Sequence, residues 1–195
     1  MNTQDSSHSE TADTPYLGDF EKEKLLRIAR ETLTEYLKTG TTPEYTPGGP
    51  GLLQEVATFV TLRQRNGELR GCIGRIEVSQ PLYRTVQESA ISAATKDFRF
   101  PSVTASELND ILIEISVLSP FRPFSSPDEI HIGRHGLLLR KDLRVGLLLP
   151  QVASDRGWDR DEFLRAVCLK ANLPSDDWRD ADVYVFSAEV FEEEG

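Results

Sequence analysis

The dipeptide Asn66-Gly67 is the feature that most constrains the fold, because it separates two runs with the composition of β-strands. Asn-Gly readily adopts the positive φ angles of a tight two-residue turn, and it is the strongest short-range signal for a β-hairpin. The runs on its two sides are Ala-Thr-Phe-Val-Thr-Leu-Arg and Leu-Arg-Gly-Cys-Ile-Gly-Arg-Ile. We therefore predict a hairpin over residues 57–76, and with it an antiparallel sheet.

A two-residue turn would also fix which residues of the hairpin face each other. Counting outward from Asn66-Gly67 pairs Arg63 with Arg70 and Thr61 with Cys72. Directly opposed residues share one face of a sheet, so the hairpin has an apolar face and a polar face. The predicted polar face carries Thr61, Arg63, Arg70 and Cys72.

The rest of the chain mixes helical and strand patterns. Apolar residues recur at helical spacing from Asp19 to Gly40, over 81–95, and again after Pro150. The run 111–118, Ile-Leu-Ile-Glu-Ile-Ser-Val-Leu, predicts a strand, two short strands are expected to flank Lys141-Asp142, and residues 183–186 are expected to form the final strand. Residues 1–16 are rich in Ser, Thr, Asp and Glu and predict a disordered tail, which leaves 17–195 for one globular domain or two small lobes.

Composition and charge exclude several classes of protein. The net charge of −10 argues against a nucleic-acid binder, whose affinity comes from clustered Lys and Arg. No apolar run reaches the roughly 18 residues that a membrane span needs, and the first residues lack the features of a secretory signal. Two cysteines far apart in the chain predict reduced thiols, so we expect a cytoplasmic protein.

Cys72 is the first candidate for chemistry. Gly71 and Gly74 flank it at close range, and glycine inside a strand marks a bulge or the close approach of a backbone or ligand. A nearby arginine such as Arg70 would lower the pKa of the thiol and increase its thiolate fraction. Three interpretations stay open at this point: a small buried apolar side chain, part of a binding surface, or a nucleophile.

Two further groups of polar residues are candidates. Glu114 lies in a strongly apolar strand, so it is either the ionic partner of Arg63 or Arg70 or a general acid or base. Asp97 and Arg99 follow a helix end, where they form a structural ion pair or bind an anion.

Two other polar features are assigned structural roles. His131 and His135 have a spacing that suits a metal only on a helix, and the glycines beside them oppose a helix there. Cys168 falls on an apolar helical stripe and is expected in a core. We predict neither a metal nor a cofactor.

Several motifs together resemble one known family. The segment Phe-Val-Thr-Leu at 59–62 and the segment Leu-Arg-Gly-Cys-Ile-Gly at 69–74 are similar to the signature of the AMMECR-one domain family, which in prokaryotes is also called AmmeMemoRadiSam system protein A. The resemblance continues, in order, over about residues 20–192. It is carried by Pro81-Leu82, Ala-Ala-Thr-Lys-Asp-Phe-Arg-Phe-Pro at 93–101, Ile-Glu-Ile-Ser-Val-Leu-Ser at 113–119, His135-Gly136-Leu137, Leu149-Pro150-Gln151-Val152 and Trp178-Arg179-Asp180. Phe98 departs from the family pattern, because many members have proline there.

The resemblance implies an α+β fold of two lobes within a single domain over 17–195, each lobe an antiparallel sheet with packed helices. It also implies that Leu-Arg-Gly-Cys-Ile-Gly faces a cleft between the lobes, that Gln151 borders this cleft, and that a Memo-like protein and a radical SAM protein are partners. It brings no reaction with it.

Residues and resemblance together give two functional hypotheses. In the first, a cleft enzyme acts on a peptide, protein or anionic substrate: Cys72 attacks, Arg70 favours the thiolate and Glu114 handles protons. The residues expected to bind the substrate are Thr61, Arg63, Gly71, Gly74, Asp97, Arg99 and Gln151. In the second, the protein is a non-catalytic module that binds a partner or presents a substrate within the same system.

Overall fold

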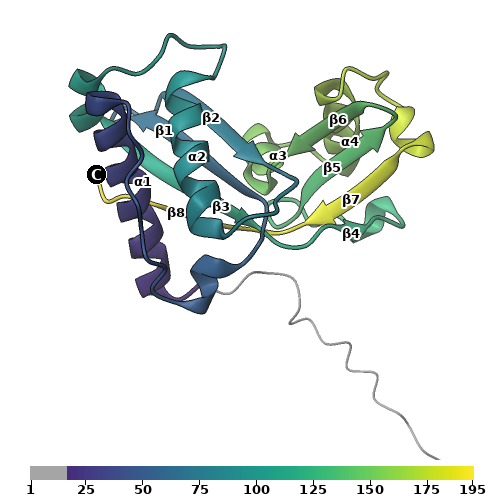
Figure 1. Ribbon diagram of the computed structural model, residues 1–195. Coiled ribbons are helices and arrows are strands. Elements are labelled where there is room, and N and C mark those ends of the chain that lie inside the picture. Colours follow the sequence, from purple (N-terminus) through teal and green to yellow (C-terminus); the bar gives the residue numbers. More distant parts are fainter. Residues whose placement is uncertain (1–16) are drawn as a thin grey trace, which may run out of the picture. The chain divides into compact units, whose positions relative to one another are not determined.

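The computed structural model describes residues 17–195 and divides them into two compact units (Figure 1). The terminal unit consists of residues 17–119 and 188–195, and the inserted unit runs from Pro120 to Ser187. The predicted tail, residues 1–16, lies outside the described residues.

The terminal unit is a four-stranded antiparallel sheet, sheet A, with helices on one face. Its strand order is β2-β1-β3-β8. Figure 1 shows α1 and α2 lying across the same face of this sheet. The elements are α1 (Asp19–Thr39), η1 (Pro50–Leu53), β1 (Thr58–Gln64), β2 (Leu69–Arg75), α2 (Leu82–Thr95), η2 (Ala105–Asp110), β3 (Ile111–Leu118) and β8 (Ala188–Glu192).

Periodicity explains how these elements pack. Helix α1 ends at Gly40, whose φ of 78° is the left-handed conformation that glycine adopts without strain. The helix buries one stripe of apolar residues against the sheet, and the sheet contributes every second residue of β1 and β3 to the same core. Members of this core include Leu25, Ile28, Leu33, Val60, Leu62, Val86, Ile113 and Ile115. The opposite face of sheet A carries the alternate residues, which include Thr61, Cys72 and Glu114.

The inserted unit has its own sheet and its own core. Sheet B is antiparallel with the order β4-β7-β5-β6. Its elements are β4 (Arg122–Pro123), η3 (Pro127–Glu129), β5 (Gly136–Lys141), β6 (Arg144–Leu148), α3 (Pro150–Arg156), α4 (Arg160–Lys170), η4 (Asp177–Asp180) and β7 (Asp182–Phe186). Phe163, Val167 and Cys168 of α4 are fully buried in its core, which confirms the prediction for Cys168.

The predicted α+β class with two antiparallel sheets is confirmed, but one strand assignment was wrong. Residues 183–186 do form a strand, β7, yet it is not the last one. After Ser187 the chain enters β8, which pairs with β3 in the other sheet. Among residues 17–195, none of the helices combines the length and apolar character required to cross a membrane.

Candidate functional site

The hairpin turn is one residue longer than the sequence predicted. The Gln64 carbonyl accepts from the Gly67 amide at 2.8 Å, and the Gln64 amide donates to the Glu68 carbonyl at 2.8 Å, so three residues form the loop. The predicted pairing of Arg63 with Arg70 is therefore wrong, and Arg63 faces Leu69 instead. A bulge at Arg70 absorbs the extra residue and restores the predicted register, which pairs Thr61 with Cys72.

The bulge gives Arg70 a structural partner. Its side chain is buried, and its Nε and Nη2 donate to the Glu107 carboxylate at 2.8 and 3.3 Å. Its Nη1 donates to the Pro101 carbonyl at 2.9 Å. The hydrogen bonds that Arg70 donates to the Glu107 carboxylate lower the pKa of Glu107 to about 2. Arg70 thus ties β2 to the chain before β3, and it does not act on the thiol as predicted.

A row of side chains crosses sheet A on the face opposite the helices. Cys72 pairs with Thr61, and Thr61 pairs with Glu114, so the three lie side by side on β2, β1 and β3. The Thr61 hydroxyl donates to Cys72 Sγ at 3.2 Å, and Arg63 Nε donates to the Glu114 carboxylate at 3.3 Å. Of the two arginines expected as ionic partners of Glu114, it is Arg63 that pairs with it. We call Thr61, Arg63, Cys72 and Glu114 the Cys72 face.

Asp97 holds the edge of this face in place. Its carboxylate accepts a hydrogen bond from the Cys72 amide at 2.9 Å. It also accepts hydrogen bonds from Nε and Nη2 of Arg99 at 2.9 and 2.6 Å. The Asp97 side chain is only 3% exposed, and the hydrogen bonds from Arg99 lower its pKa to about 2. The interpretation of Asp97 and Arg99 as a structural ion pair fits this geometry. Because β2 is an edge strand, Asp97 also satisfies a backbone donor that would otherwise face outward.

The thiol of Cys72 is held in its neutral form. Burial raises the pKa of Cys72 and outweighs the hydrogen bond from Thr61 and the charge of Arg99, both of which lower it. The negative charges of Glu114 and Asp97 raise it further. The cation that acts on the thiol is therefore Arg99 and not Arg70. The sequence did not predict this role because Arg99 lies in a loop, and strand register does not show which residues a loop side chain contacts.

The two glycines of the motif serve packing. Gly71 faces the helices, and a Cβ at this position would overlap the backbone carbonyl of Ala93 in α2. Gly74 lies on the same face as Cys72, but a Cβ there would overlap the ring of Phe59. The prediction of a close backbone is thus confirmed for Gly71. The open trough predicted beside Cys72 is wrong at Gly74, where Phe59 occupies the space.

The other polar residues singled out from the sequence lie in the inserted unit. Gln151 is the second residue of α3. His135 is buried, hydrogen-bonds to the Glu129 carbonyl at 2.9 Å through Nδ1, and has its pKa lowered mainly by burial. No group of three or more His, Cys, Asp or Glu side chains suited to a metal occurs within residues 17–195.

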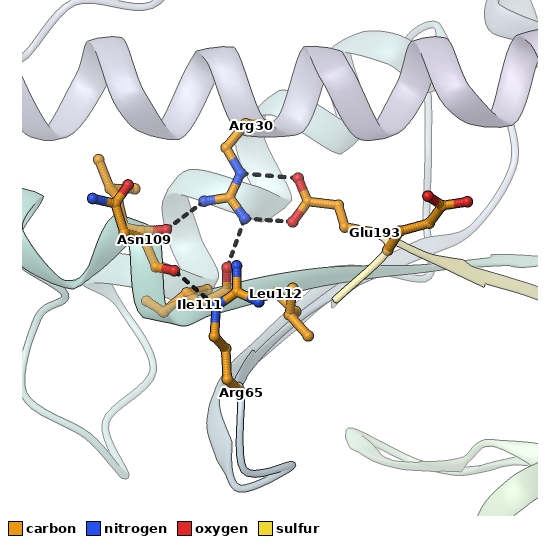
Figure 2. Close-up of a pocket in the computed structure, with 8 residues that line it drawn as sticks. Arg30, Arg65, Asn109, Ile111, Leu112 and Glu193 are labelled. Carbon is orange, nitrogen blue, oxygen red and sulfur yellow. Dashed lines mark hydrogen bonds and ion pairs between the residues drawn. The ribbon is translucent and has the colours of Figure 1, made fainter.

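Sequence reasoning did not predict the pocket near the start of β3, which has a volume of about 460 Å³ (Figure 2). Figure 2 shows Arg30 reaching from α1 toward Glu193, while Arg65 approaches from the hairpin turn. Arg30 donates to the Glu193 carboxylate and to two backbone carbonyls, so it serves the fold. The lining residues are Arg30, Arg65, Leu108, Asn109, Ile111, Leu112, Glu193 and Glu194.

These features define an α+β protein of two sheet-and-helix units, one of which displays a neutral thiol among paired charges. The family model AMMECR1 matches residues 26–191, and the chain belongs to that family. Protein MK0488 of Methanopyrus kandleri is 47% identical over 184 residues, with 89% of each chain covered. A protein of Thermococcus onnurineus is also 47% identical, over 186 residues that cover 88% of this chain and 90% of that protein. The resemblance seen in the sequence is thereby confirmed.

A solved structure supports the fold. The crystal structure of the uncharacterized protein PH0010 from Pyrococcus horikoshii matches with a TM-score of 0.84 and 42% sequence identity. The match covers 88% of this chain and 91% of that chain.

Proposed function

We propose that the Cys72 face is a recognition surface, and that the protein is a partner-binding or substrate-presenting module. The observation that supports this most directly is the state of the thiol. A nucleophilic cysteine reacts as the thiolate, whereas burial raises the pKa of Cys72 and keeps it protonated at neutral pH. A neutral thiol that accepts a hydrogen bond from Thr61 suits a surface that packs against another molecule.

The charges on and beside this surface also suit recognition. Arg63 is paired with Glu114, and Arg99 is paired with Asp97, yet both arginine side chains are more than a third exposed. Exposed charges held in place by a neighbour confer specificity and speed association with a complementary surface. We infer a peptide or protein segment, or an anionic group, as the ligand. The family resemblance suggests a Memo-like protein and a radical SAM protein as the partners, and the unpaired cysteines suit a cytoplasmic location.

An enzyme is the second candidate. In it Cys72 attacks the substrate and Glu114 accepts the proton. The hydrogen bond from Thr61 and the charge of Arg99 favour this candidate, since both lower the pKa of the thiol. Burial outweighs them, so we place binding first.

A binding experiment with matched variants separates the two candidates. The wild-type chain, Cys72→Ser, Arg63→Glu and Arg84→Glu are titrated calorimetrically with a purified Memo-like protein and with a purified radical SAM protein. Arg63→Glu removes a cation from the Cys72 face, and we expect it to weaken binding by about tenfold or more. Arg84→Glu reverses an exposed charge on α2, away from this face, and is expected to leave binding unchanged.

The cysteine variant decides between binding and catalysis. If the face only binds, Cys72→Ser changes the affinity less than about threefold, because serine has the same shape and can still accept the hydrogen bond from Thr61. Failure of the wild-type chain to bind either protein would count against the partner assignment. Loss of a turnover that the wild-type chain and the two proteins perform together, caused by Cys72→Ser alone, would favour the enzyme.

A further inference from the structure

The two edges of sheet A are built differently. At the β2 edge, Asp97 accepts the outward amide of Cys72 at 2.9 Å, and the bulged residue Arg70 is bonded to Glu107 and Pro101. Bulges and covering loops are devices that stop a sheet edge from pairing with another chain. The β8 edge lies at the opposite side of the same sheet.

Register shows which backbone groups of β8 point outward. The Glu193 amide donates to the Ile113 carbonyl at 3.0 Å, and Phe191 pairs with Ile115, so these residues turn their backbone groups toward β3. In an antiparallel pair the intervening residues point the other way, and these are Val190 and Glu192. Within residues 17–195, the amide and carbonyl groups of these two residues have no hydrogen-bond partner.

Strand β8 is short and carries two glutamates, but it lacks three other devices that protect a sheet edge. Its sequence, Ala-Glu-Val-Phe-Glu, contains no proline or lysine, and it pairs with β3 without a bulge. Val190 is 45% exposed, so an apolar side chain accompanies the free backbone groups. Two ion pairs to α1 fix the strand: Lys22 with Glu189 at 2.6 Å, and Arg30 with Glu193. A rigid edge loses little conformational entropy when a ligand strand pairs with it.

We propose that the outer edge of β8 binds an extended, basic segment of a partner protein by β-strand addition. Backbone hydrogen bonds to Val190 and Glu192 would supply affinity, and alternating side chains would supply specificity. Charge selects a basic segment, because Glu192 and Glu194 are exposed at this edge and the whole chain carries a net charge of −10. An apolar residue of the segment would lie beside Val190. Glu192 pairs with Glu114, so its side chain borders the Cys72 face, but the backbone groups that would bind the segment belong to β8 and have no part in the function proposed for that face.

The test uses a defined peptide with the full chain. The probe has about seven residues, a usual strand length, with lysine alternating with valine or threonine and both ends blocked. We expect the amides of Val190 and Glu192 to exchange quickly with solvent in the free chain and to slow by about tenfold or more when the probe is saturating. The same peptide N-methylated at alternate amides keeps its charge but loses its donors, so it should not bind.

Variants of the chain place the interaction at β8. Val190→Pro removes one outward donor, and proline is tolerated at an edge position whose amide faces solvent, so binding should fall while the unfolding midpoint holds. Glu192→Lys reverses the charge without changing the backbone and should also weaken binding. Val145→Pro changes an exposed valine of β6, the edge strand of sheet B, and serves as the control with unchanged affinity.

Four outcomes would overturn the proposal. They are equal binding of the N-methylated peptide, equal binding by Glu192→Lys, slow exchange at Val190 and Glu192 in the free chain, and a dimer joined through β8 in sedimentation experiments. Arg63→Glu changes the Cys72 face and leaves β8 intact. A negative result at β8 is therefore distinct from failure of the function proposed for that face.

Discussion

Cys72 shows how neighbouring groups compete for control of one side chain. Burial disfavours the thiolate, and the carboxylates of Glu114 and Asp97 act in the same direction. The Thr61 hydroxyl and the Arg99 guanidinium act in the opposite direction and are outweighed. Since the pKa of Cys72 is raised, its thiolate forms at a higher pH than that of an unburied cysteine.

Alkylation measures this directly. We expect the rate of Cys72 modification by iodoacetamide to rise with a midpoint above the value of about 8.5 for a free cysteine. Thr61→Val removes the hydroxyl donor at nearly constant volume, so it should move the midpoint higher still. Cys168, buried in the inserted unit, is the internal control and should react more slowly than Cys72. A midpoint below about 7 would contradict the raised pKa and favour the hypothesis that Cys72 is a nucleophile.

At the scale of elements, Arg30 links three of them and the residue that follows β8. From α1 it donates to the Leu108 carbonyl in η2 at 2.8 Å and to the Ile111 carbonyl at the start of β3 at 2.7 Å. Its Nε also donates at 2.9 Å to Glu193, the residue after β8, and Nη2 contacts the same carboxylate (Figure 2). Only a planar guanidinium presents donors in all of these directions.

Removing this arginine should therefore destabilise the terminal unit. We expect Arg30→Ala to lower the free energy of unfolding by about 2–4 kcal/mol, because it leaves two carbonyls without this donor and leaves the half-buried Glu193 carboxylate with the Ile113 amide alone. Arg30→Lys keeps the charge but not the fork and should recover less than about half of the loss. The control is Arg160→Ala, whose carboxylate partner is 92% exposed and whose loss should cost less than about 1 kcal/mol. Urea unfolding measures all three, and equal losses for Arg30 and Arg160 would refute the argument.

The sequence predicted those elements whose periodicity is local. The helix from Asp19 and the strand 111–118 follow from apolar spacing, and the pairing of Thr61 with Cys72 follows from Asn66-Gly67. The register held only because an added loop residue and the bulge at Arg70 compensate each other. The position of the bulge depends on the ion pair between Arg70 and Glu107 of η2, two residues that are far apart in the sequence. Strand β8 was missed because it is short and two of its five residues are acidic, and its pairing with β3 spans about 70 residues of intervening chain.

At the scale of the whole molecule, the inserted unit interrupts the terminal one. The chain leaves sheet A after β3, builds the inserted unit, and returns to sheet A as β8, with only Ser187 between β7 and β8. Each unit has a separate apolar core: the terminal core contains Ile113, and the inserted core contains Phe163. Local sequence does not show that two consecutive strands belong to different sheets, which is why residues after 186 were left unassigned.

Separate cores predict separate unfolding transitions. Both tryptophans of the chain, Trp158 and Trp178, pack against the inserted core, so their fluorescence reports that unit alone. Phe163→Ala should lower the stability reported by fluorescence by about 3–5 kcal/mol. It should leave hydrogen exchange of the β3 amides within about 0.5 kcal/mol of wild type, because variants without shared contacts act independently. Ile113→Ala should destabilise the terminal unit by about 2–5 kcal/mol, as reported by exchange of the β3 amides, and should leave the stability reported by fluorescence unchanged. If either substitution moves both signals together, the two units unfold as one cooperative body, and β8 transmits the loss from one sheet to the other.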